Sequence, residues 1–430
     1  MKNFDWNTLT QSERKECLSR PTTQNDQNIT SSTRQIVEDV KANGDKAVKS
    51  YTKRFDKVEL NNLKVSKEEM KHASSTIAQD KKQAIEIAYN NITLFHKNQG
   101  LRAFSENISN DIQCERRVVP LESVGLYVPG GTAPLVSTAL MNGIPSQIAG
   151  CKNRIMCTPC DKNGGINPHI LYAAQLCGIA TIFKVGGAQA IAAMAYGTET
   201  IPSVDKIFGP GNTYVTSAKK IVSECPNGAA LDMPAGPSEV CVIADDTTNP
   251  IFAAADLLSQ AEHDPLSQAV LISTSTHMRD NVLKEIENQR KALSRTAIIE
   301  QSLEKSISII AEDMTQAIEI ANAYAAEHLI LCFDNAEQYV DQIIHAGSIF
   351  VGPWSPESAG DYCSGTNHVL PTYGYAKNYS GLSVEAFQKT ITVQKLSRKG
   401  LESLSRTIID IANLEGLDAH ANAVSLRLKD

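Results

Sequence analysis

The amino-acid sequence predicts an α/β protein in which parallel sheets are connected by helices. Three segments each run from an apolar strand through a glycine turn into a helical stretch, namely VGLYVPGGTAPLVSTALM, TIFKVGGAQAIAAMAYG and DKIFGPGNTYVTSAKKIV. Such strand–turn–helix units are typical of a parallel sheet with crossover helices. Their strands are apolar throughout, which fits a sheet that is buried on both faces.

The segments before and after these units have their own patterns. The first 95 residues are rich in helix-forming stretches, and apolar residues at helical spacing on both sides of Asn43-Gly44 predict a helical hairpin. Four later strands, EVCVIAD, QAVLIST, HLILCF and GSIFVG, alternate with helices and indicate a second α/β unit. Residues 354–380 read as a long ordered loop of the kind that is often functional. From about residue 382 we expect a small unit that ends in helices.

Composition narrows the class of protein. The 430 residues are 42% hydrophobic and 21% charged, which is typical of a soluble protein with two or three domains. A net charge of −7, without a basic block, argues against nucleic acid as a partner. No apolar run approaches the ~18 residues of a membrane span. Because the N-terminus lacks the apolar core of a signal peptide, we expect a cytoplasmic protein without a membrane partner.

Ten cysteines are spread along the chain, and in a cytosolic protein we expect them to be reduced and mostly buried. Cys157 and Cys160 have the spacing of a redox pair or of half a zinc site. No second pair with suitable spacing follows, so a structural zinc site is disfavoured there.

The glycine turns are candidate ligand sites, because free N–H groups at the start of a helix suit an anion such as a phosphate. The turns are Gly130-Gly131, Gly186-Gly187 and Gly209-Pro210-Gly211. None completes the dinucleotide fingerprint, since Tyr214 stands where the third glycine would be. Three turns in one sheet predict a small-molecule cleft without naming its ligand. The alternative is that these glycines only permit tight turns.

A second candidate site involves Gln260 and His263, which are three residues apart and would share one face of a helix that ends before Pro265. Four histidines have a carboxylate close in the sequence: His263, His328, His368 and His420. Imidazole, carboxylate and amide groups together suit a divalent metal such as zinc. For each of these histidines a hydrogen-bonded structural role remains the alternative.

Several motifs resemble one known family over nearly the whole chain. Besides the three glycine-turn segments they are DMPAGPSEV, DLLSQAEHDP, AEHLI and GDYCSGTNHVLPTYGYA, and the similarity continues to AHANAVSLR at the C-terminus. AGPSEV and the long loop motif are highly specific. On these motifs the chain is identified as a member of the histidinol dehydrogenase family.

The resemblance implies an α/β fold with two Rossmann-like parallel-sheet domains, a helical N-terminal segment and a small C-terminal domain, in an intertwined homodimer. We expect a helical segment over residues 1–26 and a nucleotide-binding domain over 127–238. An α/β domain of residues 27–126 plus 239–381 would carry most of the zinc and catalytic residues. Residues 382–430 would form the C-terminal domain and supply a zinc ligand.

The resemblance further implies a zinc-dependent enzyme with one zinc ion per subunit that uses NAD. It would oxidise L-histidinol through L-histidinaldehyde to L-histidine, the last step of histidine biosynthesis. The implied zinc ligands are Gln260, His263, Asp361 and His420. The implied acid–base pair is Glu327 and His328, and the implied nucleotide contacts are Tyr127, Gln189 and Asn212. The implied substrate contacts are Ser238, His368 and Glu415, together with His328 and the metal ligands. One departure is Ala326, which stands where the family usually has a proline before the acid–base pair.

The chemistry of the side chains favours a mechanism in which an imidazole is the base and a carboxylate activates water. His328 suits removal of the hydroxyl proton, and Glu327 suits activation of the water that hydrates the aldehyde for the second oxidation. Glu415 would pair with the substrate ammonium, and the dimer is expected to share its active sites. A thiohemiacetal on Cys363 is a competing mechanism. The competing functions are a metal-dependent hydrolase or lyase on the same fold and a catalytically silent paralogue, which the retained Glu327 and His328 disfavour.

Overall fold

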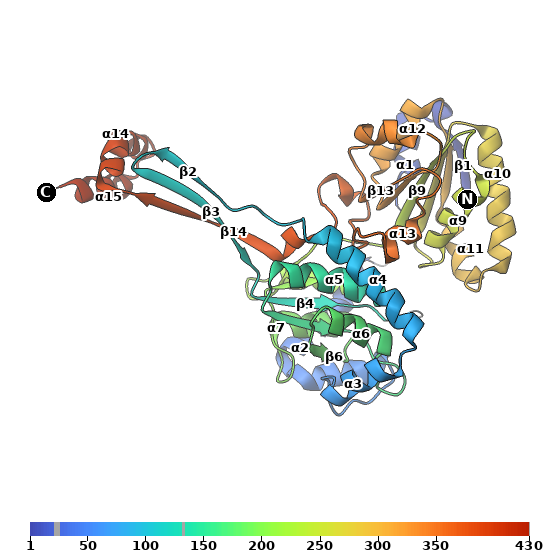
Figure 1. Ribbon diagram of the computed structural model, residues 1–430, viewed down its shortest axis with the longest axis horizontal. Coiled ribbons are helices and arrows are strands. Elements are labelled where there is room, and N and C mark those ends of the chain that lie inside the picture. Colours follow the sequence, from blue (N-terminus) through green and yellow to red (C-terminus); the bar gives the residue numbers. More distant parts are fainter. Residues whose placement is uncertain (21–25, 131–133, 430) are drawn as a thin grey trace.

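The computed structural model describes residues 1–20, 26–130 and 134–429. It contains two parallel sheets and one antiparallel sheet, with helices packed around the parallel ones (Figure 1). The predicted α/β class is therefore confirmed. We refer to the five-stranded lobe, the six-stranded lobe and the arm, each defined below. Gly131, in the first glycine turn, lies outside the described residues.

The five-stranded lobe contains all three predicted strand–turn–helix units. Its strands are parallel and lie in the order β6-β5-β4-β7-β8. They are β4 (Ser123–Tyr127), β5 (Asn153–Cys157), β6 (Thr181–Phe183), β7 (Lys206–Phe208) and β8 (Ala230–Leu231). The helices that follow four of them are α5 (Val136–Ala149), α6 (Pro168–Leu176), α7 (Gly187–Tyr196) and α8 (Thr213–Ser223). The predicted units correspond to β4–α5, β6–α7 and β7–α8.

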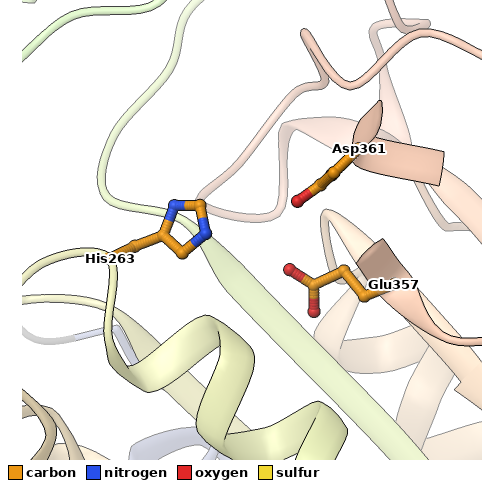
Figure 2. Close-up of side chains that lie close together, drawn as sticks. All are labelled: His263, Glu357 and Asp361. Carbon is orange, nitrogen blue, oxygen red and sulfur yellow. The ribbon is translucent and has the colours of Figure 1, made fainter. Parts of the chain in front are cut away.

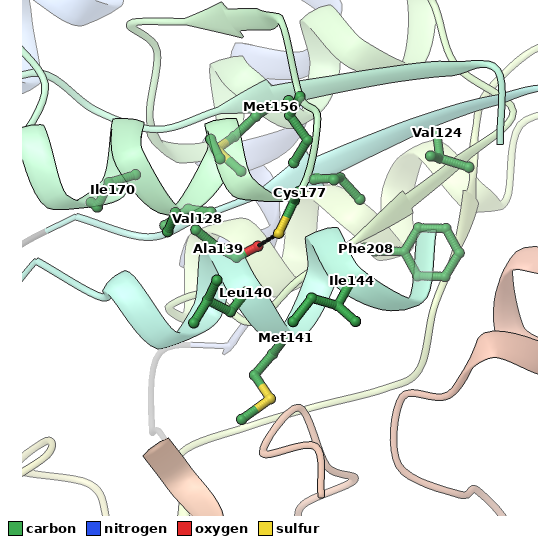
Figure 3. Packing of buried hydrophobic residues seen from close by; sticks show 14 of the residues in the cluster. Val124, Val128, Ala139, Leu140, Met141, Ile144, Met156, Ile170, Cys177 and Phe208 are labelled. Atoms are coloured by element: carbon green, nitrogen blue, oxygen red, sulfur yellow. Dashed lines mark hydrogen bonds between the residues drawn. The ribbon is translucent and has the colours of Figure 1, made fainter. Parts of the chain in front are cut away.

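The core of this lobe lies between the sheet and helix α5. Leu140 and Ile144 of α5 are buried in one cluster with Phe208 of β7 (Figure 3). The thiol of Cys177, at the end of α6, donates a weak hydrogen bond to the Ala139 carbonyl of α5. Fully burying a side chain of this size stabilises a fold by roughly 1.5–3 kcal/mol. Such packing holds the glycine turns at the ends of the strands in place.

Three helices that precede this sheet in sequence also pack on this lobe, against the helices that cover the sheet. They are α2 (Asp26–Phe55), α3 (Lys67–Thr76) and α4 (Gln79–His96). The break expected at Asn43-Gly44 is present, since Gly44 interrupts α2 with φ 53° and ψ −135°. Val37 and Val48 of α2 share a buried cluster with Ile191 of α7. The structure thus departs from the expected division, which grouped residues 27–126 with residues 239–381, because the apolar stripe of α2 is buried against the five-stranded lobe instead.

The six-stranded lobe is the second parallel sheet, in the order β1-β11-β10-β9-β12-β13. Its strands are β1 (Lys2–Asp5), β9 (Glu239–Ala244), β10 (Gln268–Ser273), β11 (Ile307–Ile310), β12 (His328–Leu331) and β13 (Ser348–Val351). Its helices are α1 (Gln11–Cys17), α9 (Pro250–Ala261), α10 (Thr276–Gln289), α11 (Thr296–Lys305), α12 (Met314–Tyr324) and α13 (Glu357–Tyr362). The N-terminal segment, expected to be helical, begins with β1 because Lys2 to Asp5 pair with Ile307 to Ile310.

The arm projects away from both lobes (Figure 1). It is an antiparallel ribbon of β2 (Phe104–Ser109), β3 (Ile112–Pro120) and β14 (Gln388–Leu396), followed by α14 (Arg398–Leu414) and α15 (Asp418–Leu428). The expected C-terminal helices are present at its far end. These helices follow strand β14, which pairs with β3 over nine residue pairs. This pairing was not predicted from the sequence.

The segment 354–380 joins the two lobes and includes α13. Asn91 of α4 donates a hydrogen bond from Nδ2 to the Cys363 carbonyl at 2.9 Å. Asn367 donates from Nδ2 to the Met141 carbonyl of α5 at 2.8 Å. This long loop therefore fixes residues of the six-stranded lobe against the five-stranded lobe. Among the described helices, none combines the length and the apolar character that crossing a membrane requires.

Candidate metal and catalytic centre

Glu327 and His328 lie at the amino end of β12 and are buried, with 5% and 4% of their surfaces exposed. Helix α12 ends just before them at Ala325, which has a left-handed φ of 55°. The carbonyl of Ala326 accepts a hydrogen bond from Gly347 N at 2.9 Å, so the chain enters the sheet directly despite the missing proline.

One hydrogen bond determines the tautomer of His328. Its Nδ1 lies 3.2 Å from the carbonyl oxygen of Glu239. Because a carbonyl can only accept, Nδ1 carries a hydrogen, so in the neutral ring Nε2 is the nitrogen that can act as a base. Nε2 lies 3.5 Å from Oδ1 of Asp361 and has no hydrogen-bond partner among the described residues. The basic nitrogen therefore faces the group of predicted metal ligands.

Carboxylates surround this imidazole. Glu327 Oε2 and Glu357 Oε1 each lie 3.8 Å from Nδ1. Burial alone would lower the pKa of His328, but the charges of Glu357, Glu327 and Asp361 outweigh it and raise the pKa to about 10. Burial raises the pKa of Glu327 to about 7, against the opposing effect of His328. Perturbed groups of this kind are concentrated at functional sites.

His263, Glu357 and Asp361 form a potential metal site, with ligand atoms that all lie within 4.8 Å of one another (Figure 2). Gln260 occupies the last turn of α9, and His263 follows in the next turn, where its N–H donates to the Gln260 carbonyl at 3.2 Å. Both amide atoms of Gln260 are buried without a hydrogen-bond partner among the described residues. An orphaned buried amide is costly unless a ligand completes it, so these residues fit a bound cation.

Glu357 was missed in the sequence analysis. It lies on the short helix α13, four residues before Asp361, so that one turn of helix presents both carboxylates on one side. Only 1% of its surface is exposed, and neither carboxylate oxygen has a hydrogen-bond partner among the described residues. The spacing PESAGD was the available signal, but it is too common to single out a site.

Two of the predicted substrate contacts, Ser238 and His368, lie on segments that adjoin the residues described above. Ser238 directly precedes β9, and its carbonyl accepts from Gln268 N at 3.2 Å. His368 lies 3.1 Å from the Ser137 hydroxyl through Nε2, at the start of α5. Burial lowers the pKa of His368, while the charge of Asp361 opposes the shift, which places this imidazole in the same electrostatic environment.

Two further predicted residues of this site, Glu415 and His420, lie at the far end of the arm and are exposed. Glu415 caps the C-terminus of α14, and His420 lies in α15. Within one chain they are remote from the group around Asp361 (Figure 1). Of the four predicted zinc ligands, His263 and Asp361 therefore come together in a single copy of the chain, Gln260 lies in the turn of helix just before His263, and His420 is remote.

The predicted nucleotide contacts lie in the other lobe, where Tyr127, Gln189 and Asn212 line one cavity of about 970 Å³. Its walls include Gly130, Gly186 and Gly187 from two of the three glycine turns. It lies at the carboxyl ends of parallel strands, the usual place for a ligand in an α/β sheet. The candidate acid–base pair, in contrast, lies at the amino end of β12, next to the amino end of β9.

Each of these three residues is held by the local fold. The hydroxyl of Tyr127 accepts from Gly187 N at 3.0 Å, and Gly187 has a left-handed φ of 67°. Asn212 caps α8, because its Oδ1 accepts from the backbone N–H groups of Tyr214 and Val215 at 3.1 Å. Its Nδ2 is the group left to donate to a ligand. Gln189 is 2% exposed and lies in the first turn of α7.

No sequence pattern predicted the part of this cavity that comes from the end of α2 and the residues after it. Arg54 and Asp56 line the cavity, and burial raises the pKa of Asp56. Arg54 and Asp56 lie more than 70 residues before Tyr127, the nearest predicted nucleotide contact. No local sequence pattern therefore connected these charged residues with the predicted nucleotide site. Cys160 lines the same cavity whereas Cys157 is buried. All ten cysteines are free thiols, and Cys363 is exposed.

Comparison with known proteins identifies close relatives. The sequence profile of the family described as Histidinol dehydrogenase matches residues 18–428. A histidinol dehydrogenase of Vibrio cholerae is 49% identical over 429 residues, covering 100% of this chain and 99% of the relative. One from Escherichia coli is 49% identical over 425 residues, with coverage of 99% and 97%. The crystal structure of histidinol dehydrogenase from Elizabethkingia anophelis superimposes with a TM-score of 0.93 at 48% identity, covering 100% of this chain and 98% of that one.

Proposed function

Because the chain belongs to the histidinol dehydrogenase family, we propose that it oxidises L-histidinol through L-histidinaldehyde to L-histidine with NAD. The observation that supports this most directly is the position of His328 Nε2, 3.5 Å from Asp361 and beside His263 and Glu357. A general base thus adjoins a group of metal ligands, and a cavity of about 970 Å³ for a nucleotide lies in the neighbouring lobe.

We assign Gln260, His263 and Asp361 as zinc ligands, with His420 of a second copy as the fourth. The orphaned amide of Gln260 and the convergence of His263 with Asp361 support this donor set. A bound zinc ion would serve as a template that holds the amine and imidazole nitrogens of the substrate. Oxygen ligands from Gln260 and Asp361 tolerate the extra coordination that such binding requires.

In the first oxidation His328 acts as the general base in its neutral form, which a cation bound beside Asp361 would favour by offsetting the carboxylate charges that raise its pKa. Its Nε2 accepts the hydroxyl proton while the hydride leaves the carbinol carbon for NAD. The Nδ1–H remains bonded to the Glu239 carbonyl, so the ring keeps its orientation as it gains charge. The buried carboxylates of Glu327 and Glu357 stabilise the imidazolium that forms.

In the second oxidation Glu327 activates the water that hydrates the aldehyde. A carboxyl group whose pKa is near 7 is suited to take and return a proton at neutral pH. After His328 has released its first proton to solvent, it removes a proton from the gem-diol as the second hydride leaves for a second NAD. Both steps use one group of side chains, so the reactive aldehyde need not leave the site.

We further propose a homodimer in which the arm of each copy completes the site of the other. His420 and Glu415 are exposed at the far end of the arm, and Glu415 would pair with the substrate ammonium. Large apolar side chains on the arm are also exposed, among them Leu414 at 86% and Leu426 at 55%. Apolar surface of this kind is characteristic of an interface. The ten free thiols fit a reducing, cytoplasmic location.

Absorbance of NADH after addition of L-histidinol and NAD tests the activity. We expect two NADH for each histidinol consumed, with histidine as the product, and a much weaker response with NADP or with other amino alcohols. A metal-dependent hydrolase or lyase would give no NADH, and that result would overturn the proposal.

A further inference from the structure

The backbone of Glu239 contacts both members of the acid–base pair. Its N–H donates to Oε2 of Glu327 at 2.9 Å, and its carbonyl accepts from Nδ1 of His328. The first bond orients the carboxylate, and the second fixes the tautomer of the imidazole. The position of one peptide segment at the start of β9 therefore determines the geometry of both catalytic side chains.

The side chain of Glu239 is itself fixed by Arg20. Arg20 Nε donates to Oε1 at 2.9 Å and Nη2 donates to Oε2 at 3.0 Å, a bidentate pair in which only 1% of the Glu239 side chain is exposed. Tyr373 N also donates to Oε1 at 2.9 Å. Two-point pairing between guanidinium and carboxylate restricts orientation as well as distance.

Arg20 also binds the helix that leads into the site. Its Nη2 lies 2.5 Å from the carbonyl of Tyr324, the last residue of α12, and its guanidinium lies 3.8 Å from the centre of the Tyr324 ring. Tyr324 precedes Glu327 by three residues. Arg20 thus holds both the beginning of β9 and the end of α12, the two segments from which the catalytic geometry is built.

We propose that the Arg20–Glu239 pair is a positioning device for Glu327 and His328, an inference that rests on their proposed role as the acid–base pair. A buried ion pair gives little net stability, because its desolvation offsets its attraction, so stability alone is a weak reason for it. Its effect on geometry is larger, since a displacement of about 1 Å at a reacting group can cost ~10²-fold in rate.

Kinetics of the zinc-loaded, full-length enzyme test this inference through Arg20→Ala and Glu239→Gln. We expect kcat to fall roughly 10- to 100-fold in each. The KM for NAD and the zinc content should remain as in the wild type, because neither residue lies in the cavity or among the metal ligands. The double variant should lose little more than either single variant, since both changes break one device. Arg20→Lys should recover part of kcat, as it keeps the charge but loses the two-point contact.

Two controls separate positioning from general destabilisation. Val282→Ala removes buried volume in α10 and lowers the melting temperature without touching the site. Arg290→Ala removes an arginine that pairs with Glu287 and Glu300 in the same lobe. Both should keep kcat near the wild-type value.

A normal kcat in Arg20→Ala and Glu239→Gln would overturn the inference, as would a loss that Val282→Ala reproduces at an equal melting temperature. Glu327→Gln and His328→Asn distinguish this from failure of the proposed function. If those two variants are impaired while Arg20→Ala and Glu239→Gln are normal, only the positioning role is wrong. A wild-type enzyme that makes no NADH from histidinol overturns the proposed function itself.

Discussion

The Nε2 atom of His328 lies 3.5 Å from Oδ1 of Asp361. This contact joins the start of a central strand to the short helix in the loop between the lobes. It places the proposed base next to a proposed metal ligand, so a substrate held at the ligands would present its hydroxyl to the base.

Glu327→Gln should block oxidation of the aldehyde more than oxidation of the alcohol, because only the second step needs an activated water. We expect a loss on the order of 10²-fold or more in the aldehyde step. Single-turnover NADH formation, started separately from histidinol and from histidinaldehyde, measures the two steps. An equal loss in both would contradict the role of Glu327 in activating water.

Glu357→Gln should lower the pKa of His328 in the metal-free protein. Burial alone would lower this pKa, and the charge of Glu357 is the largest effect that raises it to about 10. Because the pKa of His328 is higher in the folded protein than its value of 6.5 in the unfolded chain, protonation of this ring stabilises the fold fully below pH 6.5. This contribution to the free energy of unfolding is lost as the pH rises through about 10. NMR titration of the imidazole, assigned with His328→Asn, measures the shift. An identical pKa of His328 in the wild type and in Glu357→Gln would show that Glu357 does not act on this ring.

Removal of the metal should abolish activity and lower the melting temperature by several degrees, because a ligand that binds only the folded state stabilises it. Readdition of zinc should restore both properties. His263→Asn should melt at a similar temperature with or without chelator, since its site no longer holds the ion tightly. Full activity after complete chelation, checked by metal analysis, would refute a role for the metal.

Mixing His420→Ala chains with Glu327→Gln chains should recover about a quarter of the wild-type activity after subunit exchange. Random pairing makes half of the dimers mixed, and each mixed dimer has one intact site. The matched control mixes Glu327→Gln with Asp361→Ala, which alter the same part of the site and should recover nothing. If neither mixture recovers activity although exchange is verified, the sites are not shared.

Cys363→Ser should keep near-normal turnover. The thiol is exposed, and the Cys363 carbonyl, rather than its sulfur, makes the contact with Asn91. Steady-state kcat for histidinol measures the effect. A loss of ~10³-fold would instead support a thiohemiacetal intermediate.

The sequence by itself determined the strand–turn–helix units of the five-stranded lobe, because strand and helix periodicity and glycine turns are local properties. It also indicated Gln260 and His263 through their spacing in the sequence, although α9 ends at Ala261 and His263 lies in the turn that follows. The family motifs then named Glu327, His328 and Asp361, which the structure brings together. For Tyr127, Gln189 and Asn212, the neighbouring glycine turns already pointed to a cleft, and they line one cavity.

Only the tertiary structure decided which segments meet. β1 pairs with a strand about 300 residues later, α2 packs on the lobe that follows it in sequence, and the arm carries His420 away from Asp361. Likewise, only the tertiary structure identified Glu357 and the Arg20–Glu239 pair. Each depends on contacts between segments far apart in the chain, and local spacing contains no information about such contacts. Burial of apolar faces selects them when the whole chain folds.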